Sequence, residues 1–450
     1  MTSQLNIAVI GSGISGLSAA WLLSRHHRVT LIEAASRFGG HSNTVDVDGR
    51  DGSIPVDTGF IVYNLASYPN LIALFEYLGV PTAKTDMSFA VSINDGSYEY
   101  AGSGIRTVFG QLTNLVCRDH WRMVVDTLRF YREATELLAR SGDEDETIGA
   151  YLQRRDYSRA FVDRHIQPMA SAIWSTPSSR MLDFPATAFA RFFANHGLLT
   201  LRDRPEWRTV MGGSRVYVQR LLADVRAERK IGIPVRQVFR HAEGVRVVSD
   251  NGSSEFDACV LATHADDALA LLGDADSCER ELLQAFRYTS NTAVLHRDDR
   301  TMPRRRRLWS SWNYIGREST HSDPACVTYW MNNLQPLGST APDLFVSLNP
   351  NREIAASKIE ATFEYAHPIF DCAAMRAQRS LWQLQGRRHT WFCGSYFGYG
   401  FHEDGLQAGL AVAEDIGGVR RPWSVNNDSD RLHIIPRALR PPTQALEAAE

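Results

Sequence analysis

The sequence predicts an α/β fold, in which a domain built on a parallel sheet alternates along the chain with a second domain. Three patterns predict it. An apolar run over residues 7–10, typical of a strand buried on both faces, precedes three closely spaced glycines and a helical pattern. Apolar residues recur at helical spacing between residues 104 and 196, and they alternate with polar ones from about residue 290 to 385. The second domain is therefore expected to be a mixed or antiparallel sheet under a helical cap.

The three glycines have the spacing G-x-G-x-x-G. Gly11 allows a tight turn, Gly13 leaves the backbone open to a pyrophosphate, and Gly16 lets the next helix pack on the strand. The N-terminus of that helix supplies free N–H groups and a partial positive charge. Residues 29–32 predict a second strand, and Glu33 at its end can accept hydrogen bonds from ribose hydroxyls. This arrangement predicts a Rossmann-like dinucleotide-binding domain.

A second glycine cluster indicates which dinucleotide. Arg37 precedes Gly39 and Gly40, and it would bring a guanidinium towards the pyrophosphate. The segment E-A-x-x-R-x-G-G-H, which begins at Glu33, resembles the FAD signature of the flavin amine oxidase, protoporphyrinogen oxidase and phytoene desaturase superfamily. The last position is usually Arg in that superfamily, and His41 in its place removes one phosphate contact.

Three later stretches carry the same resemblance. Residues 56–60 resemble the superfamily's D-x-G turn, residues 211–214 its mid-chain double glycine, and residues 391–409 its closing flavin motif. The resemblance implies a glutathione-reductase-type domain that holds FAD without a covalent bond. The residues that it assigns to FAD are Gly11, Ser12, Gly13, Ile14, Ser15, Gly16, Glu33, Ala34, Arg37, Gly39, Gly40, His41, Ser42, Gly59, Phe60, Ile61, Val238, Ala262, Thr263, Gly394, Asp404, Gly405 and Leu406.

The length of 450 residues is too great for one ordinary core, so two domains are expected. We expect the FAD-binding domain to be discontinuous, and the substrate domain to be inserted into it. The polar, proline-bearing tail is expected to be an extension or disordered. The predicted ranges are 1–90, 207–290 and 386–425 for the FAD-binding domain, 91–206 and 291–385 for the substrate domain, and 426–450 for the C-terminal extension.

Composition excludes several classes of function. The net charge of −3 provides no global basic field, so nucleic acid is not expected as a partner. The six cysteines form no C-x-x-C pair and no metal-ligand spacing, so we expect no metal and a reducing compartment. No apolar run approaches ~20 residues and no leader is apparent. The chain is expected to be cytoplasmic, with peripheral contact on the inner face of the membrane left open.

The closing motif contains the candidate reacting groups. A glycine-aromatic loop leads into a helix whose N-terminus would stabilise negative charge on a reduced flavin ring. Asp404 is expected either to contact the cofactor or to cap that helix. His402 is either a reacting group or a structural hydrogen-bond donor, and Tyr329 either lines the cavity or packs in the core. The predicted catalytic residues are His402, Tyr399 and Tyr329.

Shorter stretches narrow the resemblance to bacterial FAD-dependent oxidoreductases associated with cyclopropane fatty acid synthases and related lipid methyltransferases. This implies a methyltransferase partner and an acyl-lipid substrate, methylated or unsaturated, free or esterified in phospholipid. The leading hypothesis is a fatty-acyl desaturase that passes hydride to flavin N5, with dioxygen as the acceptor. The stretches are residues 294–296, 302–305, 311–314, 329–335, 348–350, 367–368 and 400–405.

Two alternatives remain at this point. Amine oxidases of the superfamily usually carry a lysine near N5 and an aromatic pair facing the flavin. Tyr396 and Tyr399 could supply the pair, but Lys84, Lys230 and Lys358 lie outside the flavin motifs. The other alternative is a flavin-bearing protein that delivers lipid to a methyltransferase.

Two basic stretches could serve membrane contact. The run of residues 304–307 with Trp309 is either a solvated loop or a site for anionic headgroups. Arginines such as Arg122 and Arg129, interleaved in the helical pattern, are either the solvated face of the cap or a face that rests on lipid.

Overall fold

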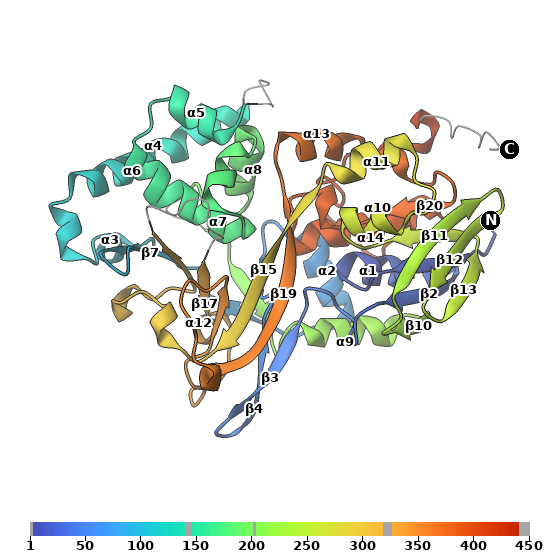
Figure 1. Cartoon of the computed structure of the whole chain (residues 1–450), viewed down its shortest axis with the longest axis horizontal. Helices are drawn as coiled ribbons and strands as arrows, with labels where there is room; N and C mark the ends of the chain where they lie inside the picture. Colours follow the sequence, from blue (N-terminus) through green and yellow to red (C-terminus); the bar gives the residue numbers. More distant parts are fainter. Residues whose placement is uncertain (1–2, 140–145, 201–203, 318–325, 441–450) are drawn as a thin grey trace.

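The computed structural model describes residues 3–139, 146–200, 204–317 and 326–440. It has two lobes (Figure 1): a nucleotide-binding lobe, which contains β1 near the start of the described chain and α14 near its end, and a substrate lobe that ends in a group of helices. The predicted α/β fold with its interleaved domains is confirmed. In the described part of the chain, no helix combines the length and apolarity that crossing a membrane requires.

A five-stranded parallel sheet forms the centre of the nucleotide-binding lobe. Its first strand is the apolar run predicted from the sequence, and Ile7, Ala8 and Val9 are fully buried. Every neighbouring pair of strands is parallel. In spatial order the strands are β10 (Glu228–Ile231), β2 (Arg28–Glu33), β1 (Asn6–Ile10), β14 (Ala258–Leu261) and β20 (Thr390–Phe392).

Helices and a small meander cover this sheet. Helix α1 (Ile14–Leu23) is buried along its whole length and crosses α14 (His402–Ile416) closely, because a Cβ on Gly409 would lie 2.2 Å from the Ser15 carbonyl oxygen. The other covering elements are α2 (Pro69–Leu78), α9 (Arg215–Asp224), α10 (Ala265–Leu271), α11 (Ser277–Gln284), α13 (Cys372–Ser380), β11 (Val235–His241), β12 (Gly244–Ser249) and β13 (Gly252–Phe256).

A seven-stranded mixed sheet forms the substrate lobe. Its pairs are antiparallel except β7 with β16, which are parallel. Strands β7 and β15 of this sheet begin at Phe89 and Arg287, slightly before the predicted domain boundaries at residues 91 and 291. The order is β19 (Ile359–Ile369), β15 (Arg287–His296), β18 (Phe345–Leu348), β17 (Val327–Trp330), β16 (Trp312–Gly316), β7 (Phe89–Ile93) and β8 (Tyr98–Ala101).

The helical cap lies at the far end of the substrate lobe (Figure 1). The sequence predicts a kink at Pro168, and a π-helical turn (Val162–Ile166) lies directly before α7 (Gln167–Trp174), since proline offers no N–H to continue the ladder. The other cap helices are α3 (Ile105–Val108), α4 (Arg118–Ala139), α5 (Ile148–Arg154), α6 (Arg159–Phe161) and α8 (Ala186–Asn195).

Short elements connect the lobes. They are the ribbon of β3 (Thr44–Gly49) with β4 (Gly52–Asp57), and the small sheet of β5 (Val62–Asn64), β9 (Trp207–Val210) and β6 (Thr82–Thr85). Helix α12 (Met331–Leu334) belongs to the substrate lobe, where it follows β17.

The tail is not disordered over residues 426–440, contrary to one of the two expectations. Arg431 forms an ion pair with Asp404 at 2.9 Å, and both side chains are buried. The carbonyl of Asp428 accepts hydrogen bonds from Asn70 and Arg421. These polar contacts hold a segment that has few apolar residues. Residues 441–450 lie outside the described residues.

Candidate active site

The first glycine turn forms an open cradle at the end of β1. Gly11 has φ +99°, and Gly16 lies so close to it that a Cβ would be 1.9 Å from the Gly11 carbonyl oxygen. A Cβ on Gly13, in contrast, would meet nothing within 4 Å. The Glu33 carboxylate accepts hydrogen bonds from the backbone N–H of Ser12 at 2.9 Å and from its hydroxyl at 2.5 Å. The Glu33 carboxylate therefore stabilises the turn through Ser12, and the space beside Gly13 is open to a ligand.

The second glycine loop packs against the first. The N–H of Gly39 donates to the carbonyl of Ser12 at 3.0 Å. The Arg37 guanidinium donates to the carbonyls of Gly40 at 2.7 Å and Ser42 at 3.1 Å. Arg37 is not among the residues of the described cavity wall, and its hydrogen bonds stabilise the loop that carries Gly40; its approach to a pyrophosphate stays a prediction.

A cavity of about 820 Å³ runs from this cradle into the substrate lobe, within the range of roughly 300–1,000 Å³ for ligand sites. Most residues predicted to bind the cofactor lie in its wall. They are Gly11, Ser12, Gly13, Ile14, Ser15, Glu33, Ala34, Gly40, His41, Gly59, Phe60, Ile61, Ala262, Thr263 and Gly394. The predicted residues that lie behind the described wall are Gly16, Arg37, Gly39, Ser42, Val238, Asp404, Gly405 and Leu406.

Val238 lies behind the wall because of the way β11 runs. Its side chain is fully buried in the lobe's core. The strand pairing shifts register between Val235 and Gln237, and Val235 and Arg236 form the wall at this point instead. The assignment of Val238 to the cofactor, which the resemblance implies, stays a prediction.

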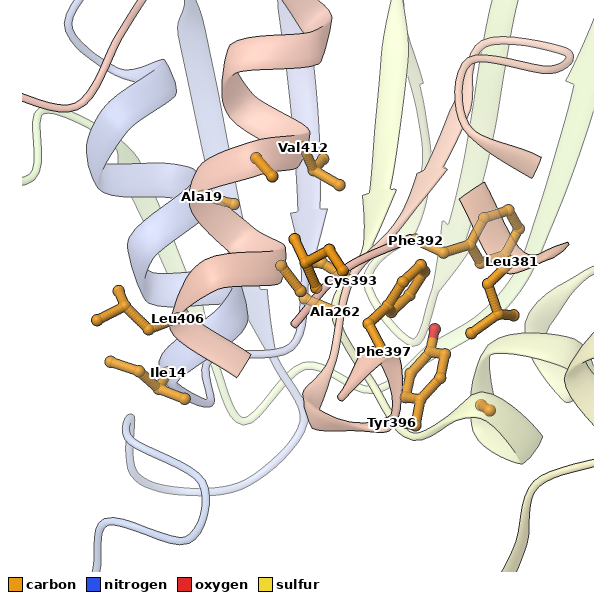
Figure 2. Packing of buried hydrophobic residues seen from close by; sticks show 14 of the residues in the cluster. Ile14, Ala19, Ala262, Leu381, Phe392, Cys393, Tyr396, Phe397, Leu406 and Val412 are labelled. Carbon is orange, nitrogen blue, oxygen red and sulfur yellow. The ribbon is translucent and has the colours of Figure 1, made fainter. Parts of the chain in front are cut away.

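The start of α14 is committed to packing. Asp404 accepts the N–H of Phe401 at 2.7 Å, which is the capping role that the sequence analysis weighed, in addition to its pairing with the tail. A Cβ on Gly405 would lie 2.9 Å from the Ile14 side chain. Figure 2 shows Leu406 beside Ile14 where the two helices meet. Gly405 and Leu406 therefore join α14 to α1, Asp404 caps α14 and pairs with the tail, and none of the three is among the residues of the described cavity wall.

His402 is held by two hydroxyl groups. Its ring stacks on Phe60 with 3.7 Å between centroids, and its Nε2 lies 2.8 Å from the Tyr217 hydroxyl and 3.1 Å from that of Ser42. Burial lowers the pKa of His402 to about 3, so the ring is neutral at physiological pH. Ser42, predicted as a cofactor residue, is not in the described cavity wall, and its hydroxyl instead forms a hydrogen bond with His402.

A second group of rings surrounds His41. Its imidazole stacks on Tyr365 at 5.0 Å between centroids, with His367 at 5.6 Å and His264 at 6.1 Å. Burial, with a further contribution from these two histidines, holds the pKa of His41 well below its usual value. The Nε2 of His41 is buried and has no hydrogen-bond partner among the described residues.

The substrate half of the cavity is apolar and aromatic. The predicted catalytic residues Tyr329 and Tyr399 line it, as does Tyr396. Burial raises the pKa of all three tyrosines, so each keeps its proton. The other apolar residues of this half come from several elements of the chain. They are Met87, Phe89, Met169, Ile173, Trp174, Phe192, Leu198, Trp207, Trp312, Leu348, Phe370 and Phe401.

Sequence reasoning missed most of this half. Met169 and Ile173 on α7 and Phe192 on α8 follow the same helical apolar pattern as core residues, so no local signal separates them. Trp330 and Asn332, which follow Tyr329 closely in the sequence, are not in the described wall: the Trp330 indole donates to Asp343, and the Asn332 side chain donates to the Pro342 carbonyl.

Charge is confined to one end of the cavity. In the described wall the charged side chains are Glu33, Arg236 and Asp267, all on elements of the nucleotide-binding lobe. All three lysines of the chain are described, and none lines the cavity; Lys84 and Lys358, for example, pair with acids elsewhere.

These features fit FAD. The opening at Gly13 leaves room for a pyrophosphate beside a helix N-terminus, and Glu33 stands where a ribose would lie. The partnerless Nε2 of His41 offers a polar contact in an otherwise closed wall.

Comparison with known proteins agrees with this geometry. Residues 14–343 match the profile of the flavin-containing amine oxidoreductases. AofH of Mycobacterium tuberculosis, named as a flavin-containing monoamine oxidase, is 26% identical over 266 residues, 57% of this chain and 56% of its own length. The coproporphyrinogen III oxidase of Propionibacterium freudenreichii is 29% identical over 182 residues, 38% of this chain and 32% of its own. The chain thus spans little more than half the length of the first relatives.

Solved structures share the fold. One is described as a protoporphyrinogen oxidase from Exiguobacterium sp. 255-15, with a TM-score of 0.66, 18% identity and coverage of 92% of this chain and 99% of that one. A putrescine oxidase triple mutant has a TM-score of 0.67 at 17% identity, covering 92% and 98%. A CLA-producing fatty acid isomerase from P. acnes has a TM-score of 0.65 at 14% identity, covering 92% and 99%.

Proposed function

The chain belongs to the flavin-containing amine oxidoreductase family and is an FAD-dependent oxidoreductase, and from this premise we propose that its substrate is a fatty-acyl chain. The reaction proposed is a desaturation of a methylated or unsaturated chain, free or esterified in phospholipid. The observation that carries the proposal is the apolar substrate half of the cavity. Burial of CH₂ groups contributes about 0.8 kcal/mol each, so such a wall favours a long hydrocarbon.

The residues of the chain position a C–H bond and exclude water. FAD, when bound, accepts a hydride equivalent from carbon and passes the electrons to an acceptor. Rings such as Trp312 and Tyr329, at 5.1 Å between centroids, hold the wall rigid, and fixed orientation is a large source of rate. Desaturation also releases a proton, and we propose that it passes to solvent, because burial lowers the pKa of His41 and of His402 too far for either ring to hold it.

The test is anaerobic mixing of the holoenzyme with candidate substrates. A methylated or unsaturated fatty acid should bleach the flavin absorbance, and mass spectrometry should find a product with two hydrogens fewer. Ile173→Asp, which puts a charge into the apolar half, should abolish bleaching while FAD content stays unchanged. Ile359→Asp, the same change at an exposed position outside the cavity wall, is the matched control. Equal bleaching by both variants would refute an acyl site at this place.

A second candidate is an amine oxidase. Its support is the family, the relative AofH, and the tyrosines Tyr396 and Tyr399 in the wall. Against it stand the distance of all three lysines from the cavity and the lack of an acid in the described apolar half. Bleaching by primary or secondary amines, without bleaching by any acyl lipid, would establish this candidate instead.

A third candidate is a flavoprotein that delivers lipid to a cyclopropane synthase-like methyltransferase, and such an enzyme is a proposed partner in either case. Tight lipid binding without bleaching would favour delivery. Lipid profiles of a deletion strain, with and without the methyltransferase, separate the two roles. Loss of a desaturase makes its methylated substrate accumulate, whereas loss of a delivery protein lowers methylation itself.

A further inference from the structure

The segment from α3 to the first half of α4 has its polarity reversed. Its polar residues Gln111, Asn114 and His120 are buried, whereas Ile105 and Val116 are 82% and 88% exposed. Single exposed apolar side chains are common on protein surfaces, whereas a contiguous cluster of them usually marks a contact site. The cluster, named the cap-edge patch here, consists of Ile105, Leu112, Leu115, Val116, Trp121, Val125 and Leu128.

The patch is exposed because polar bonds fix the segment's inner face. Gln111 accepts the N–H of Glu99 at 2.7 Å, and the Asn114 side chain donates to the Glu99 carbonyl at 3.0 Å. The ring of His120 bonds the Tyr98 hydroxyl at 2.8 Å. These bonds tie the segment to β8, so its apolar side chains cannot turn inward without breaking buried hydrogen bonds.

The half of the patch on α4 is a continuous stripe. Trp121, Val125 and Leu128 follow one another at spacings of four and three residues, which puts them on one face of the helix. The Trp121 indole donates to the Leu115 carbonyl at 2.9 Å and packs on Phe109 at 4.7 Å between centroids. The largest ring of the patch is therefore held in place at the surface.

Positive charge accompanies the patch. Arg106, Arg118 and Arg122 are exposed within the same segment, against one exposed acid, Asp119, which lies 3.4 Å from Arg122. The local balance is positive although the whole chain carries −3. Apolar side chains with flanking arginines are the arrangement of helices that lie in the interface of anionic membranes.

The basic residues singled out in the sequence analysis are mostly engaged within the protein. Arg305 pairs with the buried Glu99 at 2.7 Å, and Arg307 donates to a backbone carbonyl. Arg129 pairs with Glu133 at 2.9 Å. These arginines brace the lobe, and the surface with free apolar area lies beside them, at the cap-edge patch.

We propose that the cap-edge patch docks this protein on an anionic lipid bilayer. The patch lies at the end of the substrate lobe that is farthest from the nucleotide-binding lobe (Figure 1), so docking leaves the cofactor cradle away from the membrane. The proposal goes beyond the acyl substrate proposed above and does not depend on it, since a docked enzyme could act on another substrate.

The test is co-sedimentation of the holoenzyme with vesicles. The probes are vesicles of phosphatidylcholine mixed with phosphatidylglycerol, and vesicles of phosphatidylcholine alone. Binding should be strong to the anionic vesicles, weak to the neutral ones, and should fall as salt is raised towards 1 M, where the Debye length shrinks to ~3 Å. Equal binding to both vesicle types, or none, would overturn the proposal.

Two sets of variants separate the apolar and electrostatic contributions. Ile105→Ser/Val116→Ser/Val125→Ser should weaken vesicle binding at least ~10-fold, because exposed side chains lose their burial in the bilayer. Arg106→Gln/Arg118→Gln/Arg122→Gln should lose roughly fivefold per arginine on anionic vesicles. Leu439→Ser and Arg226→Gln, exposed positions on the other lobe, are the matched controls.

Other occupants of the patch give distinct results. If the protein is a dimer that the serine variant converts to monomers, with no effect on vesicles, the patch joins two copies and the proposal fails. Flavin reduction by a dissolved fatty acid, measured without vesicles, reads the proposed function independently. Unchanged reduction in the serine variant, together with lost vesicle binding, supports docking. Intact vesicle binding in the serine variant would overturn the docking proposal, whereas a wild type that docks as predicted but is not reduced by any fatty acid would count only against the acyl substrate.

Discussion

In the nucleotide half of the cavity the wall includes glycine-bearing turns that follow β1, β2 and β20, with Gly11, Gly13, Gly40 and Gly394 among its residues. In the substrate half it is mostly side chain, contributed by cap helices α7 and α8 and by strands of the second sheet. The first half holds its shape through contacts such as Gly16 against Gly11, where no side chain fits. The second holds its shape through packed rings.

The two halves of the cavity should differ in how well they tolerate amino-acid substitutions. A backbone cradle binds one chemical group and fails when a side chain is added to it. A side-chain wall can change residue by residue and accept different ligands, which is how one fold serves unrelated reactions. Substitutions in the two halves should therefore have separable effects on cofactor retention and on substrate choice.

The largest effect is expected at Gly13. Gly13→Val would put a side chain into the open space of the cradle, where nothing else lies within 4 Å, and should abolish FAD retention. The purified variant should be colourless and folded, as judged by circular dichroism. A yellow variant with normal FAD content would show that the pyrophosphate lies elsewhere.

Asp57 is buried between the segments that carry Ser214 and Gln335, and its substitution is expected to have the second largest effect. It accepts hydrogen bonds from the Ser214 N–H at 2.8 Å and from the Gln335 side chain at 2.9 Å, and burial raises its pKa from 3.8 to about 6. The folded state thus binds a proton that the unfolded state has released, so this contribution to stability is complete below about pH 4 and is lost as pH rises through about 6.

Asp57→Asn removes this proton linkage. Two pKa units correspond to about 2–3 kcal/mol, so the stability of the wild type relative to the variant should fall by that amount between about pH 4 and pH 7. Denaturant unfolding at each pH measures it. A constant difference across this range would mean that Asp57 titrates normally.

Glu33→Ala tests the ribose contact and the brace under the first turn. Loss of hydrogen bonds to a charged group costs about 1.5–3 kcal/mol, so FAD should bind roughly 10–100-fold more weakly. Glu33→Gln, which keeps an oxygen acceptor, should lose less. Equilibrium dialysis or fluorescence titration with FAD compares them, and equal affinity in all three proteins would remove Glu33 from the cofactor site.

The smallest effect is expected from the charge state of His402. With its pKa at about 3, its ring stays neutral from about pH 5 to 8. The pH profiles of flavin reduction in wild type and in His402→Gln should therefore have the same shape over this interval. An inflection near pH 6.5 that only the wild type shows would establish His402 as a titrating catalytic group.

Sequence reasoning succeeded where neighbours in the chain are neighbours in space. Gly11, Gly13, Gly16 and Glu33 lie within one strand–helix–strand unit, so their spacing fixes their geometry. It failed where a contact joins distant segments. The bond between Tyr217 and His402 is an example, because such pairs of residues leave no local periodicity.

Strand register, and the exposed face that a binding partner would contact, were harder still to predict from the sequence. The register shift in β11 beside the wall residues Val235 and Arg236 depends on the pairing of this strand with β12, which periodicity does not contain. The reversed polarity near Gln111 looks like an ordinary amphipathic pattern until the structure shows which face is covered. Patterns give the faces of an element, and only packing assigns one of them to the interior.

The close crossing of α1 and α14 has a consequence for synthesis of the protein. Helix α1 leaves the ribosome early, yet the helix that covers it, and β20 beside β14, are translated hundreds of residues later. Until then the nascent chain exposes apolar surface on a helix that is fully buried in the finished protein. Loading of the cofactor should therefore follow synthesis of α14, and chains that stop before residue 402 should be recognised by chaperones and proteases rather than by FAD.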